Sequence, residues 1–150
     1  MTHRPVYRRR AMLAGLAATP VLITAARAET FDQPGKPGPA GFMSVAQRML
    51  DRAVAAGDQP FGAVVVKNGK IVGWGPSRVV SDTDPTAHAE MVALRDAAKR
   101  LGTRDLAGCV MYSTSHPCPM CEAGAYWAGI DRFVHGSGLS NGDAPRLRRC

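Results

Sequence analysis

The chain has 150 residues, enough for one domain with a sizeable core and too few for two. Its four cysteines are too sparse for a disulfide scaffold, and an apolar content of 45% argues against a disordered or coiled-coil protein. The formal net charge of +7 is uneven, because residues 1–28 hold five basic residues and no acidic one, which leaves 14 basic against 12 acidic residues elsewhere. Because the charges after residue 28 are nearly balanced, this part of the chain offers no basic face that would demand a nucleic acid, and we expect no nucleic acid as a partner.

Residues 1–28 are typical of an export signal. Arginines at 8–10 precede an uncharged stretch over 11–26, and Ala26-Arg27-Ala28 fits the small-x-small site that signal peptidases cleave. The stretch falls short of the roughly 20 residues of a membrane-spanning helix, so we expect no stable membrane anchor. Residues 9–13, Arg-Arg-Ala-Met-Leu, resemble the twin-arginine motif, which implies a folded protein sent to the periplasm or medium. The alternatives are an uncleaved anchor or a basic tail beside a buried helix.

The next segments predict a linker, a helix and a hairpin. Residues 29–41 are rich in proline and glycine and predict an extended linker ahead of a domain over 42–150. Residues 42–58 have apolar side chains at helical spacing, with Ser44 as a candidate N-cap. Residues 60–75 hold two apolar runs joined by Asn68-Gly69, the pair that tight primed turns favour, and therefore predict a β-hairpin.

The second half alternates between helices and strands. The strongest predicted helix lies within residues 85–102. Asp84 or Thr83 is placed to cap its start, and Gly102 follows its end. A strand, a short helix and a further strand follow over 108–114, 118–129 and 130–136. Strand–helix–strand repeats give parallel crossovers, whereas the hairpin adds an antiparallel pair. The order therefore predicts an α/β fold with three layers, α/β/α, around a mixed sheet.

Cys118 and Cys121 form the one cysteine pair with ligand spacing. Such a pair alone fits a redox dithiol, a disulfide or half of a metal site. His88, at the start of the strongest helix, is the best third ligand, although a lone histidine there can equally be structural. Three ligands leave one tetrahedral position open, as in catalytic zinc sites. Glu90 is placed beside that position, where it can take a proton from water and hand it to a leaving group.

His88-Ala89-Glu90 followed by Pro117-Cys118-Pro119-Met120-Cys121 matches the H-x-E and P-C-x-x-C pattern of zinc-dependent nucleobase deaminases. From residue 42 to about 138 the chain resembles the cytidine/deoxycytidylate deaminase superfamily, and it is most similar to bacterial guanine deaminases and tRNA adenosine deaminases. The resemblance implies a cytidine-deaminase-like fold, Zn²⁺ held by His88, Cys118 and Cys121, and Glu90 as the catalytic proton carrier. It further implies a small amino-heterocycle as substrate and a homodimer.

The same resemblance implies four substrate-binding positions. Phe61 matches an aromatic that packs on the base, the backbone amide of Ala89 contacts it, and Trp127 lies near the pocket. For Phe61 and Trp127 the alternative is ordinary core packing. Ser77 stands where the family has an asparagine, and a hydroxyl cannot make the paired contact of an amide. A second departure is His116, which replaces a glutamate.

Three functions compete. The favoured one is an exported zinc-dependent hydrolytic deaminase of a small nucleobase or nucleoside, guanine-type first. A tRNA adenosine deaminase is disfavoured by the balanced charge and the export signal. A non-catalytic zinc-binding relic or truncated deaminase is motivated by Ser77 and by the family's further strand and helices beyond Gly138, which we expect this sheet to lack. Glu90 argues against the relic, because a purely structural zinc site has no need of that carboxylate.

Overall fold

The computed structural model describes residues 33–142, so the predicted export signal at 1–28 and the last eight residues lie outside it. Within that range the elements follow in the order α1 Pro39–Ala55, β1 Gly62–Lys67, β2 Lys70–Pro76, α2 Ala89–Leu101, β3 Cys109–Ser113, α3 Pro119–Ala128, β4 Arg132–His135 and β5 Ser140–Asn141. None of the helices in this part of the chain is long and apolar enough to cross a bilayer.

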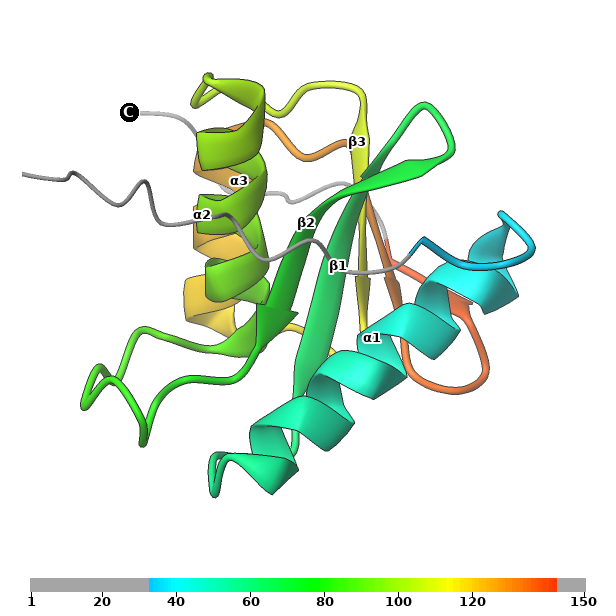
Figure 1. Cartoon of the computed structure of the whole chain (residues 1–150). Coiled ribbons are helices and arrows are strands. Elements are labelled where there is room, and N and C mark those ends of the chain that lie inside the picture. The colour runs from blue at the N-terminus through cyan, green and yellow to red at the C-terminus, as the bar shows by residue number, and fades with distance from the viewer. Residues whose placement is uncertain (1–32, 143–150) are drawn as a thin grey trace, which may run out of the picture. The chain divides into compact units, whose positions relative to one another are not determined.

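The strands form one mixed sheet in the order β2-β1-β3-β4-β5. β1 runs antiparallel to β2 and to β3, β3 and β4 are parallel, and β4 and β5 are antiparallel. The crossovers through α2 and α3 place both helices on one face of the sheet, as the uniform hand of such connections requires, and α1 covers the other face (Figure 1). The predicted three-layer architecture with a mixed sheet is therefore confirmed.

Two apolar clusters fill the space on either side of the sheet. Val64 and Val66 of β1 pack toward α1, whereas Ala63 and Val65 pack toward α2 and α3. Because β1 is covered on both faces, its sequence is a continuous apolar run without polar alternation. On the α2 side the helix lies directly on β2, and a Cβ at Gly75 would overlap the carbonyl oxygen of Ala89.

Helix α1 begins earlier than the sequence predicts. Its N-cap is Gly38 and Pro39 occupies the first turn, so the proline-rich stretch predicted as linker through residue 41 already contains helix. Proline fits this position because its fixed φ suits a first turn and its missing N–H would be unpaired there anyway. The predicted N-cap at Ser44 is wrong, since its hydroxyl lies within the helix and donates to the Gly41 carbonyl oxygen at 2.9 Å.

Helix α2 begins later than predicted, at Ala89, with His88 as its N-cap residue. The predicted caps are therefore wrong. Asp84 instead accepts hydrogen bonds from the backbone N–H and the hydroxyl of Thr86, at 2.8 and 2.7 Å, and closes a turn before the helix. Local bonding of this kind competes with helix formation. The shift places His88 at the boundary between loop and helix.

The remaining predicted turns and stops are confirmed. Asn68 and Gly69 adopt φ of 50° and 73°, as a primed hairpin turn requires. Gly102 ends α2 in the left-handed conformation as predicted, with φ of 65°, and Gly129, which was not singled out in the sequence, ends α3 in the same way, with φ of 78°. The two-residue strand β5 has no counterpart in the sequence prediction.

Candidate metal centre and active site

Three metal-donor side chains meet where α2 and α3 begin. The Sγ atoms of Cys118 and Cys121 lie 3.6 Å apart, and His88 Nδ1 is 3.6 and 3.7 Å from them. With Zn–S bonds of about 2.3 Å and a Zn–N bond of about 2.05 Å, a tetrahedral ion needs about 3.8 Å between two sulfurs and about 3.6 Å between nitrogen and sulfur. The observed spacing therefore fits a single zinc ion held by three protein ligands.

The local fold explains why these residues converge. β2 and β3 run in the same direction, and both connections leave from their carboxyl ends, β2 toward His88 and β3 toward Cys118. That edge of a sheet is the usual place for ligand sites in α/β proteins. His88 and Cys118 are the N-cap residues of α2 and α3. The positive ends of two helix dipoles therefore point at the site and favour thiolates there.

The two cysteines are free thiols in the structure rather than a disulfide. Their sulfurs are 3.6 Å apart, far beyond the roughly 2.05 Å of an S–S bond. Burial raises the pKa of the Cys121 thiol, and the Glu90 carboxylate and Cys118 raise it further. A thiolate at this position needs a cation beside it, so the donor set suits a metal ion and not a reactive redox thiol.

Glu90 lies beside the metal donors and is 4% exposed. Its Oε1 accepts a hydrogen bond from Ser113 Oγ at 2.8 Å, and its Oε2 is 3.4 Å from Cys121 Sγ. The carboxylate is not part of the three-donor cluster. One oxygen is thus held by the sheet while the other faces the site. Ser113 is the last residue of β3, and nothing in its sequence neighbourhood marks it as a partner of Glu90.

Phe61 and Ala89 lie at the same end of the domain as the metal donors. Phe61 precedes β1 and is 39% exposed, and its neighbour Gly62 exchanges hydrogen bonds with Thr114, which leads toward Cys118. Ala89 is the first residue of α2, and its side chain is fully buried, so only its backbone can reach a substrate. Their roles in substrate binding stay predictions.

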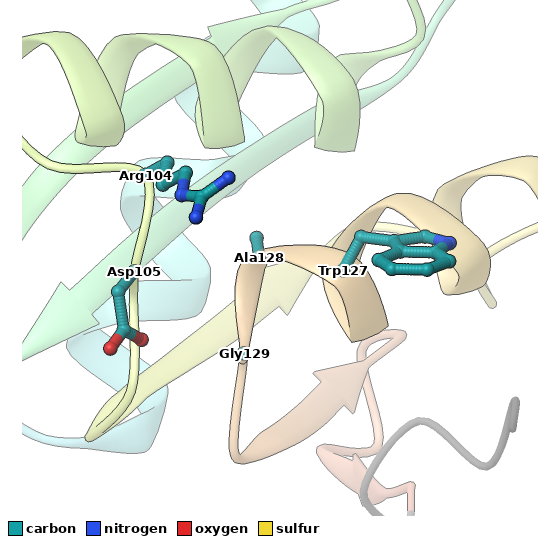
Figure 2. Close-up of a pocket in the computed structure, with 5 residues that line it drawn as sticks. All are labelled: Arg104, Asp105, Trp127, Ala128 and Gly129. Carbon is teal, nitrogen blue, oxygen red and sulfur yellow. The ribbon is translucent and has the colours of Figure 1, made fainter. Parts of the chain in front are cut away.

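Trp127 lies away from the metal donors. It stands six residues after Cys121, about 9 Å further along α3, and it is 60% exposed, so it is not a core residue. It borders a surface cavity of about 310 Å³ together with Arg104, Asp105, Ala128 and Gly129. Figure 2 shows Arg104 reaching toward Ala128 while the indole projects from the last turn of α3. The structure does not bring Trp127 to the metal centre, and its substrate contact stays a prediction.

Ser77 is buried, and its hydroxyl is directed into the protein. It is 2% exposed and donates a hydrogen bond to Asp58 Oδ1 at 2.9 Å. The donor hydrogen of Ser77 is therefore engaged within the domain. Asp58 was not among the predicted site residues, because all but one of its carboxylate's partners lie 19 or more positions away in the chain.

His116 adds an imidazole next to the segment that carries Cys118. Its Nδ1 lies 2.9 Å from the carbonyl oxygen of Pro117, and since a carbonyl only accepts, Nδ1 carries the hydrogen. The ring packs edge-on against His135, with centroids 4.6 Å apart. Burial, reinforced by His116, lowers the pKa of His135 below its ordinary value, so His135 is neutral at pH 7.

The family model of the cytidine and deoxycytidylate deaminase zinc-binding region matches residues 39–137. The chain belongs to this deaminase family. The deaminase domain is 46% identical to the guanine deaminase of Bacillus subtilis over 88 residues, covering 58% of this chain and 56% of the relative. It is 41% identical to the tRNA-specific adenosine deaminase of Aquifex aeolicus over 93 residues, covering 62% of each.

The crystal structure of the Bacillus subtilis guanine deaminase superposes on the deaminase domain with a TM-score of 0.61 and 42% sequence identity, over 63% of this chain and 61% of that one. The fold is therefore cytidine-deaminase-like, and the family's zinc-binding region includes His88, Cys118 and Cys121. The chain spans 56% of the length of this guanine deaminase and 62% of the length of this tRNA-specific adenosine deaminase.

Proposed function

We propose that the protein is an exported zinc-dependent hydrolase that removes an exocyclic amino group from a small nucleobase or nucleoside, a guanine-type ring first. The observation that carries the proposal is Glu90, a buried carboxylate fixed beside three donors whose spacing fits a zinc ion. Zinc bound to His88, Cys118 and Cys121 would supply an acidified water at its fourth position as the nucleophile.

Glu90 performs the proton transfers in this proposal. Ser113 holds Oε1, which leaves Oε2 as the oxygen that faces the metal donors. Oε2 takes one proton from the attacking water and delivers it to the ring nitrogen next to the amine-bearing carbon. It then carries the second water proton to the departing amine, which leaves as ammonia while the carbon becomes a carbonyl. Glu90 ends the cycle ionised, as it began, and the water supplies both protons.

The similarity to a guanine deaminase supports a purine base as substrate, and the half-exposed Phe61 offers an aromatic face at the metal end of the domain. The similarity to a tRNA-specific adenosine deaminase supports RNA as the second candidate. The near balance of acidic and basic residues after residue 28 favours the small substrate.

Export and dimer formation are parts of the same proposal. The support for export to the periplasm or medium is the twin-arginine-like motif and the small-x-small site within residues 1–28. Dimer formation is supported by the family resemblance, and light scattering on the purified protein tests it directly.

Ammonia release from a panel of substrates tests the activity. The panel holds guanine, adenine, cytosine, their nucleosides and a tRNA anticodon stem-loop, with the Glu90→Ala variant as the blank. We expect release from guanine or a related purine. Release from the stem-loop alone would support the tRNA candidate, and a zinc-loaded protein that acts on nothing in the panel would support the non-catalytic relic.

Metal content is a separate expectation. We expect one zinc ion per chain by elemental analysis, falling to near zero in a Cys118→Ser, Cys121→Ser double variant, because one imidazole alone holds zinc weakly. A wild-type stoichiometry near zero after folding under reducing conditions would contradict the assignment of the donor set.

A further inference from the structure

Asp58 is a buried carboxylate that neither the zinc chemistry nor the family motif uses. It lies in the loop between α1 and β1 and is 8% exposed. Its two oxygens accept five hydrogen bonds of 2.8–3.0 Å. Their donors are the backbone N–H groups of Gln59, Val80 and Ser81 and the hydroxyls of Ser77 and Ser81.

The carboxylate is ionised at neutral pH. Burial opposes the charge, but it is outweighed by the hydrogen bonds from Ser81, Gln59 and Ser77, and the pKa of Asp58 lies well below its usual range. Each donor is an amide or a hydroxyl, so the anion is stabilised by oriented dipoles. All five groups around Asp58 donate hydrogen bonds, so they match the two acceptor oxygens of an ionised carboxylate.

The segment that Asp58 binds, residues 77–81, is joined to the metal side of the domain by two backbone hydrogen bonds. The Ser77 N–H donates to the Phe61 carbonyl oxygen at 3.0 Å, and the Arg78 N–H donates to the Ala87 carbonyl oxygen at 3.0 Å. Ala87 directly precedes His88. Residues 77 and 78 therefore link Phe61, which precedes β1, to Ala87, which precedes the imidazole ligand.

The other bonds of this loop are mostly internal to it. Asp82 and Asp84 donate their backbone N–H groups to the carbonyl oxygens of Arg78 and Val79, and Arg78 forms an exposed ion pair with Asp82. These bonds shape the loop, and Arg95 of α2 holds its far end by donating to Thr86 Oγ1 at 3.0 Å and lying 4.0 Å from Asp84. Asp58 attaches the first part of the loop, residues 77–81, through side-chain bonds that bridge positions 19 to 23 residues apart in the chain.

We propose that Asp58 is a positioning residue of the metal centre, which holds residues 77–81 so that Arg78 and Ala87 fix the imidazole of His88. We call Asp58 and residues 77–81 the clamp. Ser77 is part of the clamp and is not a substrate contact, because its hydroxyl is buried against Asp58. The proposal concerns the geometry of the zinc ligands, so it can be tested whether or not the proposed deaminase activity is found.

The test compares zinc affinity and ligand geometry in full-length variants. Asp58→Asn keeps the size of the side chain but loses the charge and turns an NH₂ group toward donors. We expect it to lose up to about 10-fold in zinc affinity in a chelator competition, at the low end of the 10- to 100-fold that partners bonded directly to a ligand contribute, because Asp58 acts on His88 through the loop. In cobalt-substituted protein we also expect its d–d bands to shift relative to wild type.

Asp105→Asn is the matched control. Asp105 also accepts a backbone N–H, that of Ala107 at 3.0 Å, but it is exposed and borders the Trp127 cavity. We expect its zinc affinity and cobalt spectrum to equal those of wild type. A zinc affinity of Asp58→Asn within twofold of wild type, with an unchanged cobalt spectrum, overturns the proposal.

Ser77→Ala keeps the proposal testable if Asp58→Asn does not fold. It removes one of the five donors, and we expect a smaller loss of zinc affinity in the same direction. Where a substrate is found, its KM should stay unchanged. A raised KM with unaltered zinc affinity would make Ser77 a substrate contact and overturn its assignment to the clamp.

Discussion

At the scale of single residues, some side chains of the site can be recognised from a sequence motif, whereas others are marked only by a contact in the structure. Glu90 belongs to both groups. Its position two residues after His88 marks it in the sequence, but its orientation depends on Ser113, which lies 23 residues away. The Ser113 hydroxyl holds one carboxylate oxygen on the sheet side, so rotation of the carboxylate is restricted and the second oxygen stays on the metal side.

Replacing Glu90 therefore separates catalysis from metal binding. We expect Glu90→Gln to keep one zinc per chain and a wild-type circular dichroism spectrum, while kcat falls by at least about 10²–10⁴-fold, because an amide cannot carry the proton. Ser113→Ala should lower kcat by much less, since it frees the carboxylate without removing it. Ammonia release and zinc analysis on the same samples provide the readouts, and full activity in Glu90→Gln would exclude the proposed mechanism.

The metal ligands were predictable from sequence, because C-x-x-C spacing and an H-x-E motif put fixed chemistry at fixed positions along the chain. Ser113 and Asp58 were not. Each acts through contacts between segments far apart in sequence, and a serine at a strand end or an aspartate in a loop has no local pattern to distinguish it. Ser77 was noticed only as a departure from the family, and its partner Asp58 was missed.

At the scale of elements, the candidate metal centre depends on how closely α2 approaches β2. Gly75 lies under the first residue of α2, and a Cβ there would meet the Ala89 carbonyl oxygen as well as the backbone nitrogen and side chain of Ala93. Ala89 follows His88 directly. Any displacement of the helix start is therefore passed on to a metal ligand.

Gly75→Ala should consequently destabilise the fold and weaken the metal site together. We expect a loss of about 1–3 kcal/mol in the free energy of unfolding, the usual cost of overpacking, and a lower zinc affinity. Gly138→Ala is the control, because a Cβ at that position would have no other atom within 4 Å, and its stability should stay within about 0.5 kcal/mol of wild type. Denaturant titration of both zinc-loaded variants measures this, and equal stabilities would contradict the close-approach argument.

Element types were predictable from periodicity and turn residues, whereas helix starts were not. The hairpin at Asn68-Gly69 and the glycine stop at 102 follow from backbone conformations that only a few residues adopt readily. The starts of α1 and α2 depend on which of several neighbouring capping candidates is used. At α2, Asp84 bonds to Thr86 instead of capping the helix, and this local turn competes with an earlier helix start.

At the scale of the whole molecule, export is the proposal that the described domain does not address, and it can be tested separately. We expect residues 1–35 to send a reporter that must fold first across the inner membrane, because paired arginines direct folded cargo. Arg9→Lys with Arg10→Lys should abolish transport. Lysine keeps the positive charge, so the double variant separates the arginine motif from general basicity, and unchanged export would indicate the general secretory route.

The acid stability of the whole domain should depend on Asp58. Its pKa is lowered in the folded protein from an ordinary value of 3.8, so its stabilising contribution is fully present above about pH 4 and is lost as the pH falls through the lower folded value. At pH 7 we expect Asp58→Asn to be less stable than wild type by about 1.5–3 kcal/mol, the usual worth of hydrogen bonds to a charged group. Asp82 and Asp84, whose pKa values are also lowered, titrate in the same range, and the metal centre releases zinc in acid, but both effects are shared by the two proteins. The difference between the two denaturation curves should therefore shrink between pH 4 and pH 2, and a difference that stays constant over that range would show that the charge of Asp58 does not stabilise the fold.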